Sequence, residues 1–252
     1  MLLHVERTGD PAAPALVFLH GIATAGWMWW RQLPAFPDRY CLVVDLPGHG
    51  LSNGVPWVSL SDTAARVADV IRSTAGRAAV VGLSLGGYVA LELPSDVVER
   101  AVVSGVTAEP WPHRWFLRAG VRLTTAQLRS ARLVDAQARR LGLPEDARAA
   151  HAEAIRALRP GTYLRAAQEV SRYRPSAGRR PSAGAPPTAA PAPTLVLAGG
   201  RESPIIRRSV TQIPGATGRI VPGVGHAWNV EAPDRFNATI RDWLRSPPRS
   251  PR

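Results

Sequence analysis

One serine stands between two glycines where an apolar run changes into a helical pattern. Ser84 lies in the sequence GLSLG, after the apolar run AAVVGLS at 78–84. In the pattern G-x-S-x-G at a strand-to-helix turn, the serine hydroxyl is exposed on a strained bend, and glycines such as Gly82 and Gly86 leave room for it. We therefore predict that Ser84 is a nucleophile. The alternative is a serine in an ordinary turn, because this short pattern also occurs by chance.

A nucleophilic serine needs a base that takes its proton and a carboxylate that orients the base. Of the six histidines, His226 lies in VPGVGHAWNVEAP, a glycine-bounded loop between the last predicted strand and the last predicted helix. It is the predicted base. Glu202 follows the apolar run at 194–200 and is the predicted acid. Glu109, which follows the preceding predicted strand, and a dyad without an acid remain alternatives.

Apolar runs alternate with helical patterns along most of the chain, which predicts a parallel sheet built from strand–helix units. A helix is expected over 59–75, where Ser59 and Asp62 form a capping-box pattern. A last helix is expected to have Pro233 in its first turn. The predicted strands cover 15–21, 40–46, 78–84, 100–106, 194–200 and 218–224.

Two stretches interrupt this alternation. Residues 107–172 have only helical periodicity and predict an inserted helical domain. Residues 173–193 are rich in proline, alanine and glycine, which is typical of a flexible linker. A core domain is thus expected in two parts, 1–106 and 194–246, followed by a frayed tail at 247–252.

The chain resembles the α/β-hydrolase family. The motifs that carry the resemblance are LHG at 19–21, DLPGHGLS at 45–52, GLSLGG at 82–87 and VPGVGHAWNVEAPDRFN at 221–237. It implies an α/β fold, a mostly parallel sheet flanked by helices, with residues 107–172 as a helical cap. It also implies an oxyanion hole made by the backbone N–H groups of Ile22 and Leu85. The chain departs from the family pattern at Pro94, at the linker, and at Glu202, where an aspartate is usual.

The predicted activity is that of a serine hydrolase, which cleaves an ester, thioester or related acyl bond through an acyl-enzyme intermediate. The fold also hosts C–C bond hydrolases, lyases and non-catalytic small-molecule-binding members, and these remain alternatives. Taken singly, each aromatic residue proposed for the pocket is more often a core residue than a ligand contact. The candidates for the pocket wall are Trp27, Trp111, His113, Trp115 and Trp228.

The charge of the chain is strongly basic and comes from arginine alone. The formal net charge is +12 and the sequence contains no lysine, which excludes a P-loop and covalent pyridoxal phosphate. Residues 110–180 hold 15 arginines and five acidic residues. They predict solvated helix faces or, alternatively, attraction of an anionic acyl substrate. No nucleic-acid-binding module accompanies the charge, so we expect no nucleic-acid partner.

Neither a cofactor nor a metal ion is expected for this chemistry. The single cysteine, Cys41, lies in a predicted strand, where we expect a buried thiol. One cysteine cannot form an intramolecular disulfide, and no apolar run is long enough to span a bilayer. We therefore expect a cytoplasmic protein that acts on a small molecule and does not bind membranes.

Overall fold

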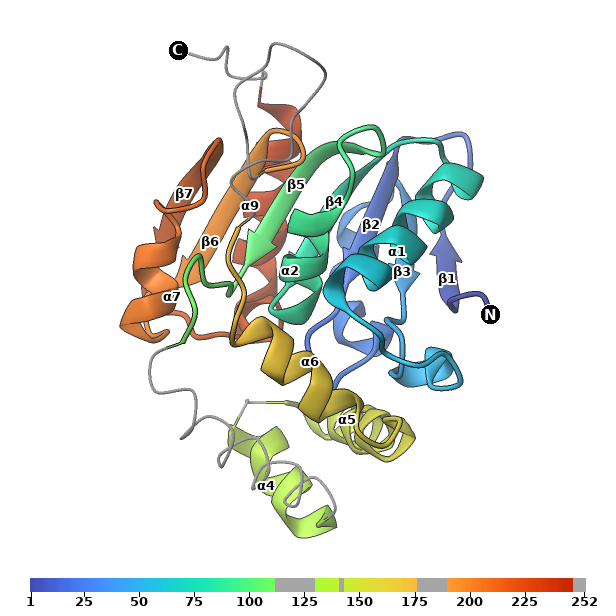
Figure 1. Cartoon of the computed structure of the whole chain (residues 1–252), viewed down its shortest axis with the longest axis vertical. Helices are drawn as coiled ribbons and strands as arrows, with labels where there is room; N and C mark the ends of the chain where they lie inside the picture. Colours follow the sequence, from blue (N-terminus) through green and yellow to red (C-terminus); the bar gives the residue numbers. More distant parts are fainter. Residues whose placement is uncertain (112–129, 141–142, 176–189, 247–252) are drawn as a thin grey trace.

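The computed structural model describes residues 1–111, 130–140, 143–175 and 190–246. These residues form a seven-stranded sheet with helices on both faces (Figure 1). The strand order is β1-β3-β2-β4-β5-β6-β7, in which β1 is antiparallel to β3 and the other neighbours are parallel. The strands are β1 (Val5–Thr8), β2 (Ala15–Leu19), β3 (Tyr40–Val44), β4 (Ala78–Leu83), β5 (Val98–Ser104), β6 (Thr194–Gly199) and β7 (Ala216–Val221).

The central strands are continuous apolar runs because both of their faces are covered. Leu16 and Phe18 of β2 belong to one hydrophobic cluster, whereas Val17 and Leu19 belong to the cluster on the opposite face. A strand buried on both sides has no polar face, so its sequence does not alternate. Each of the six predicted strands overlaps an observed one. The edge strand β1 was not predicted because most of its side chains are exposed.

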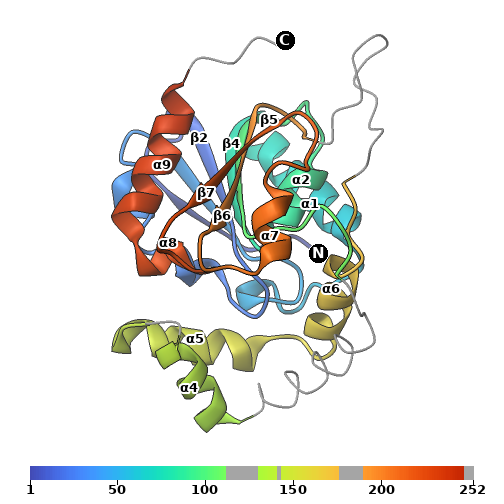
Figure 2. The same cartoon turned by 90° about the vertical axis from the view of Figure 1, so that its left-hand side faces the viewer.

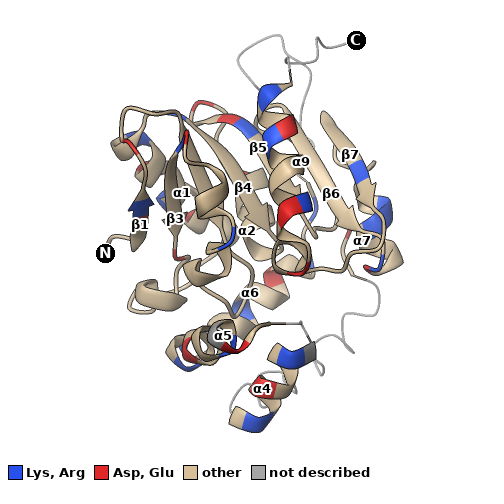
Figure 3. Ribbon diagram, turned by 180° about the vertical axis from the view of Figure 1, so that it is seen from behind, with Lys and Arg blue, Asp and Glu red and all other residues tan. Residues whose placement is uncertain are grey.

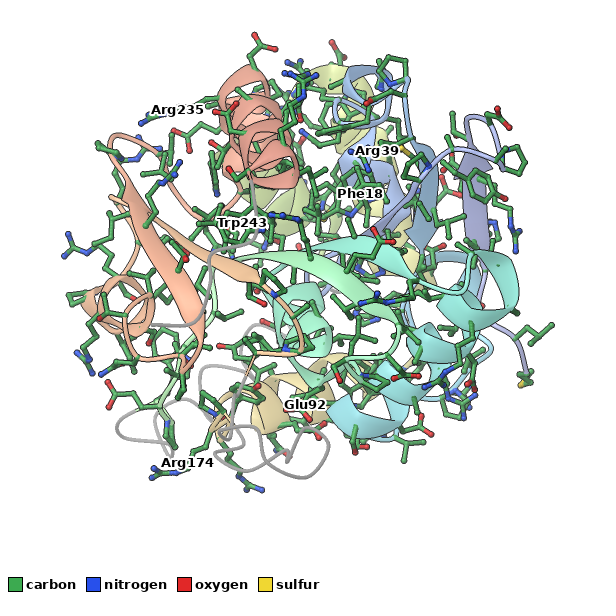
Figure 4. The ribbon with its side chains drawn as sticks, turned by 90° about the horizontal axis from the view of Figure 1, so that it is seen from above. Phe18, Arg39, Glu92, Arg174, Arg235 and Trp243 are labelled. Atoms are coloured by element: carbon green, nitrogen blue, oxygen red, sulfur yellow. The ribbon has the colours of Figure 1, made fainter. Side chains whose placement is uncertain are left out.

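Helices cover the sheet on two sides (Figure 2). On one side lie α1 (Leu60–Thr74) and α2 (Leu85–Glu92), and on the other lies α9 (Pro233–Arg245). Figure 4 shows Phe18 and Trp243 on the α9 side and Glu92 on the α1 and α2 side. Two shorter helices, α7 (Pro204–Ser209) and α8 (Trp228–Glu231), flank the last strands.

Helix starts follow the predicted signals with one difference. The Ser59 hydroxyl accepts the N–H of Asp62 at 3.0 Å, as expected for an N-cap. The Asp62 carboxylate, however, accepts from Arg66 one turn later at 2.8 Å. Of the two capping-box hydrogen bonds, the one to the Ser59 hydroxyl is therefore present, while the Asp62 carboxylate forms an i,i+4 ion pair with Arg66. Helix α9 begins at Pro233, as predicted.

Residues 130–140 and 143–172, which we call the helical segment, lie beyond the carboxyl ends of the strands (Figure 1). They form α4 (Ala131–Arg140), α5 (Glu145–Ala157) and α6 (Thr162–Val170), and no strand occurs in this described part. Basic and acidic residues are interspersed along α4 and α5 (Figure 3). The rest of the predicted helical domain, most of the predicted linker and the predicted tail lie outside the described residues.

Candidate active site

Ser84 occupies a strained turn between β4 and α2. Its φ is 53° and its ψ is −116°, a conformation that residues other than glycine rarely adopt. A Cβ on Gly82 would lie 2.3 Å from the Gly86 carbonyl oxygen, and a Cβ on Gly86 would lie 2.1 Å from that of Leu19. Both glycines are therefore required by the turn. Ser84 is the one residue in 78–91 that is not buried, so it is partly accessible to solvent.

His226 and Glu202 form a close pair at the same edge of the sheet. The distance from His226 Nδ1 to Glu202 Oε1 is 2.5 Å, and Glu202 Oε2 accepts the Gly199 N–H at 2.6 Å. The Glu202 side chain is 2% exposed, whereas that of His226 is 44% exposed. A carboxylate bonded to Nδ1 holds the proton on that nitrogen, which leaves Nε2 to accept another. The pair can therefore serve as an oriented base.

Glu109, the alternative acid, and Glu231, which follows His226 in the chain, have other partners. Glu109 forms an exposed ion pair with Arg208, with Nε and Oε1 2.5 Å apart. Glu231 pairs with Arg201 and accepts the Gly225 N–H at 2.9 Å. Neither carboxylate contacts His226, so the structure places Glu202, and not Glu109, beside the imidazole.

The two predicted oxyanion donors belong to segments that contact the serine turn. Leu85 is the first residue of α2, and N–H groups in the first turn of a helix lack partners within that helix. Ile22 follows Gly21, where an added Cβ would lie 3.7 Å from Ser84 Cβ. The Gly86 N–H donates to the His20 carbonyl at 3.0 Å and ties this loop to the turn. Leu85 adjoins Ser84 in the chain, and the loop that leads to Ile22 contacts the serine turn.

A buried polar cluster supports the loop after β2. His20 Nε2 accepts the Leu46 N–H at 2.9 Å, and Asp45 Oδ1 accepts the Gly26 N–H at 2.7 Å. His49 Nδ1 lies 2.9 Å from the Pro47 carbonyl oxygen. Burial lowers the pKa of His20 and, together with the neighbouring His20 ring, lowers the pKa of His49 to about 3. Both histidines make structural hydrogen bonds within this cluster.

The predicted pocket residues that the structure describes have different surroundings. Trp27 is half-buried, and its ring centroid lies 5.9 Å from that of His151 in α5. Trp111 is half-buried against the core, and its backbone N–H donates to the Ser171 carbonyl at 3.0 Å. Trp228 was wrongly assigned to the pocket wall. It is fully buried and packs edge-to-face on Phe236 with centroids 4.6 Å apart.

The physical reason for the Trp228 error is the turn into α8, which directs its indole into the core instead of toward the edge. His113 and Trp115, also predicted to line the pocket, lie outside the described residues. Gly105 was missed by the sequence analysis, although an added Cβ there would meet His226 and Glu202. The one available signal was a glycine directly after the apolar run that became β5.

Cys41 is buried as predicted, and burial raises the pKa of its thiol to about 11. Within the described ranges, no helix is both long and apolar enough to cross a membrane. In the same part of the chain, no three His, Cys, Asp or Glu side chains are grouped as metal ligands.

A family model described as the alpha/beta hydrolase family matches residues 16–239. The chain belongs to the alpha/beta hydrolase family. The chain is 39% identical over 99 residues to a pimeloyl-[acyl-carrier protein] methyl ester esterase of Nitrosomonas europaea. It is also 39% identical over 97 residues to a 2-succinyl-6-hydroxy-2,4-cyclohexadiene-1-carboxylate synthase of Escherichia coli. The matches cover 39% and 36% of the chain, and they span 37% of the length of each relative.

Solved structures resemble this alpha/beta hydrolase over nearly all of the chain. A hydrolase from Pseudomonas aeruginosa has a TM-score of 0.76 at 23% identity, with 97% of this chain and 94% of that chain covered. An enol-lactonase from Burkholderia xenovorans has a TM-score of 0.72 at 22% identity, with coverage of 97% and 96%. A bromoperoxidase from Bacillus anthracis has a TM-score of 0.77 at 18% identity, with coverage of 97% and 95%. At these identities the likeness establishes the fold.

Proposed function

We propose that this alpha/beta hydrolase is a serine hydrolase that cleaves an ester, thioester or related acyl bond through an acyl-enzyme intermediate. The observation that carries the proposal is the 2.5 Å contact between His226 Nδ1 and Glu202 Oε1, at the edge where Ser84 occupies its strained turn. The three residues follow the chain order serine, acid, histidine of this fold.

In the proposed reaction, Ser84 Oγ bonds to the acyl carbon while its proton passes to His226 Nε2. The carbonyl oxygen becomes an oxyanion, which the N–H groups of Ile22 and Leu85 stabilise by hydrogen bonds. The bond to the leaving oxygen or sulfur then breaks, and the leaving group takes the proton from His226. Glu202 stabilises the imidazolium formed between these steps.

Water releases the acyl group in the second half of the reaction. A water molecule adds to the acyl carbon and gives its proton to His226, and Ser84 Oγ then departs and regains that proton. The products are the free acid and an unchanged enzyme. The histidine acts as base and acid in turn, which requires Glu202 to hold it in one orientation.

We propose the helical segment as a cap over this edge, with Trp27 contributing to the contact between the two. Trp27 follows the loop that carries Ile22, and its ring packs against His151 of α5. The proposed substrate is a small acyl compound, and the arginine excess of residues 110–180 would favour an anionic one. The esterase relative supports an ester as the bond cleaved.

A fluorophosphonate probe tests the nucleophile without knowledge of the substrate. We expect mass mapping to place the label on Ser84 and expect Ser84→Ala to remain unlabelled while it keeps its thermal stability. Turnover of p-nitrophenyl butyrate should fall by at least about 1,000-fold in this variant, because loss of the nucleophile removes the whole triad pathway. A label on another residue, or retained turnover in Ser84→Ala, would contradict the proposal.

A second candidate is a non-hydrolytic reaction that uses the same residues, because one relative is a synthase. The two candidates differ in the covalent intermediate. Rapid acid quenching during p-nitrophenyl butyrate turnover should trap a butyryl group on Ser84 if the protein is an acyl hydrolase. Efficient probe labelling without any butyryl enzyme would favour the second candidate.

A further inference from the structure

The end of β5 contacts all three chain segments that carry the proposed catalytic residues. Ser104 is the last residue of β5 and Gly105 follows it. The two residues lie between β4, which leads to Ser84, and β6, which leads to Glu202. No motif of the sequence analysis included either residue.

Backbone hydrogen bonds connect this dipeptide to the nucleophile and to the acid-bearing strand. The Ser84 N–H donates to the Ser104 carbonyl at 2.8 Å, which ties the strained turn to β5. The Gly105 N–H donates to the Leu197 carbonyl at 3.0 Å, which ties the same point to β6. The positions of the serine turn and of the strand before Glu202 therefore depend on one stretch of backbone.

A buried side-chain hydrogen bond connects the dipeptide to the histidine loop. Trp228 Nε1, two residues after His226, donates to Ser104 Oγ at 2.9 Å. Ser104 is 1% exposed and Trp228 is fully buried, so water cannot replace this bond. A buried N–H that is left without an acceptor destabilises the fold, which makes this bond a restraint on the histidine loop.

Gly105 also leaves the space in which the histidine–glutamate contact forms. Its φ is +72°, and an added Cβ would lie 2.5 Å from His226 Cε1 and 2.8 Å from His226 Nδ1. The same Cβ would lie 3.3 Å from Glu202 Oε1. Any side chain at this position would therefore displace the imidazole from its carboxylate.

We propose that Ser104 and Gly105 are positioning residues that hold Ser84, His226 and Glu202 in one geometry. The inference rests on the proposed function. Ser104 uses its hydroxyl and its carbonyl for bonds to the neighbouring segments, and Gly105 acts through the absence of a side chain. A displacement of about 1 Å in a catalytic group can lower the rate by about 100-fold.

The test compares two glycine-to-alanine variants with the same φ. Gly76 also has a φ of +72°, but an added Cβ there would have no atom within 4 Å. Both Gly105→Ala and Gly76→Ala carry the strain of alanine at a positive φ, whereas Gly105→Ala alone displaces His226. We expect kcat on p-nitrophenyl butyrate to fall about 100-fold in Gly105→Ala with KM within threefold, and to stay within twofold in Gly76→Ala.

A spectroscopic readout separates positioning from a general loss of structure. The proton between His226 Nδ1 and Glu202 Oε1 should give a far-downfield ¹H NMR signal, identified by its loss in His226→Gln. We expect that signal to disappear in Gly105→Ala and to persist in Gly76→Ala. Persistence of the signal and of kcat in folded Gly105→Ala would overturn the proposal, as would equal losses in both variants.

If Gly105→Ala does not fold, Ser104→Ala tests the same positioning role. This variant removes the bond from Trp228 without backbone strain, and we expect about a 10-fold slower reaction of Ser84 with the fluorophosphonate probe. An unchanged rate of probe labelling in folded Ser104→Ala would overturn the positioning role of Ser104, and with it the proposal that Ser104 and Gly105 act together. If the unaltered protein itself fails to react at Ser84, the proposed function fails instead.

Discussion

The carboxyl edge of the sheet and the helical segment beyond it are held by different interactions. At the edge, backbone hydrogen bonds join the serine turn to β5 and to the loop after β2. The helical segment contacts the core through a small apolar cluster of Ala138, Leu143, Ala147 and Val230 and through Ala166 of α6, which belongs to a main core cluster. One backbone bond, from the Arg159 N–H to the Gly48 carbonyl at 2.9 Å, also joins the two. The serine turn is thus fixed by bonds between neighbouring strands and loops, whereas the helical segment packs on the core from outside.

Individual polar contacts of the helical segment reinforce this difference. Glu169 of α6 accepts the Leu60 N–H at 2.8 Å and Trp57 Nε1 at 3.3 Å. His151 of α5 is buried, but neither ring nitrogen has a hydrogen-bond partner among the described residues. For the proposed serine hydrolase, we therefore expect bond cleavage to depend on the edge and substrate selection to depend on the helical segment.

The largest expected effect comes from the carboxylate at the edge. Glu202→Gln should lower kcat by about 10,000-fold, because an amide cannot hold the imidazole in the required tautomer or stabilise its charge. Glu109→Gln is the matched control, since Glu109 lies in an exposed ion pair, and its kcat should stay near that of the unaltered protein. Steady-state kinetics on one activated ester provide the measurement. If kcat fell by orders of magnitude in Glu109→Gln and stayed unchanged in Glu202→Gln, Glu109 and not Glu202 would be the acid that orients His226.

Acid should destabilise the edge through its buried histidines. The pKa of His49 is about 3 in the folded protein, below the ordinary value of 6.5. Between pH 3 and 6.5 the unfolded chain therefore binds more protons than the folded protein. The contribution of neutral His49 to the free energy of unfolding is fully present above pH 6.5 and is lost as the pH falls toward 3. The slope contributed by one histidine is about 1.4 kcal/mol per pH unit.

Urea unfolding between pH 4.5 and 6.5 measures this slope. We expect His49→Gln to reduce the slope of unfolding free energy against pH by up to about 1.4 kcal/mol per pH unit, which corresponds to one proton. His151→Gln provides the comparison in the helical segment, because burial also lowers the pKa of His151. It should change the pH dependence of hydrogen exchange within 143–172. An unchanged global slope in His49→Gln would show that another group governs acid unfolding.

The smallest expected effect concerns the attachment of the helical segment. Glu169→Gln removes the charged acceptor for the Leu60 N–H and Trp57 Nε1, so KM should rise about threefold while kcat stays unchanged. Glu153→Gln is the control, because Glu153 is exposed on α5 of the same segment. Michaelis–Menten analysis separates the two parameters. A fall in kcat without a change in KM would argue against the division between edge and segment.

Local sequence patterns were sufficient for the central strands and for the serine turn. The apolar runs predicted strands because a strand buried on both faces has no polar positions. Gly82 and Gly86 predicted the turn because a side chain at either would collide with neighbouring backbone. The same logic failed for β1, whose exposed side chains carry little apolar signal.

The sequence by itself determined the residue types available for the proposed catalysis and the order of the elements that carry them. Only the tertiary structure showed which of Glu202 and Glu109 contacts His226, because both follow apolar strands. The tertiary structure also showed that Trp228 is buried in the core and that Gly105 lies against the His226 imidazole. These contacts join residues from different strands, and the chain does not specify such distances until parallel strands bring their carboxyl ends to one edge.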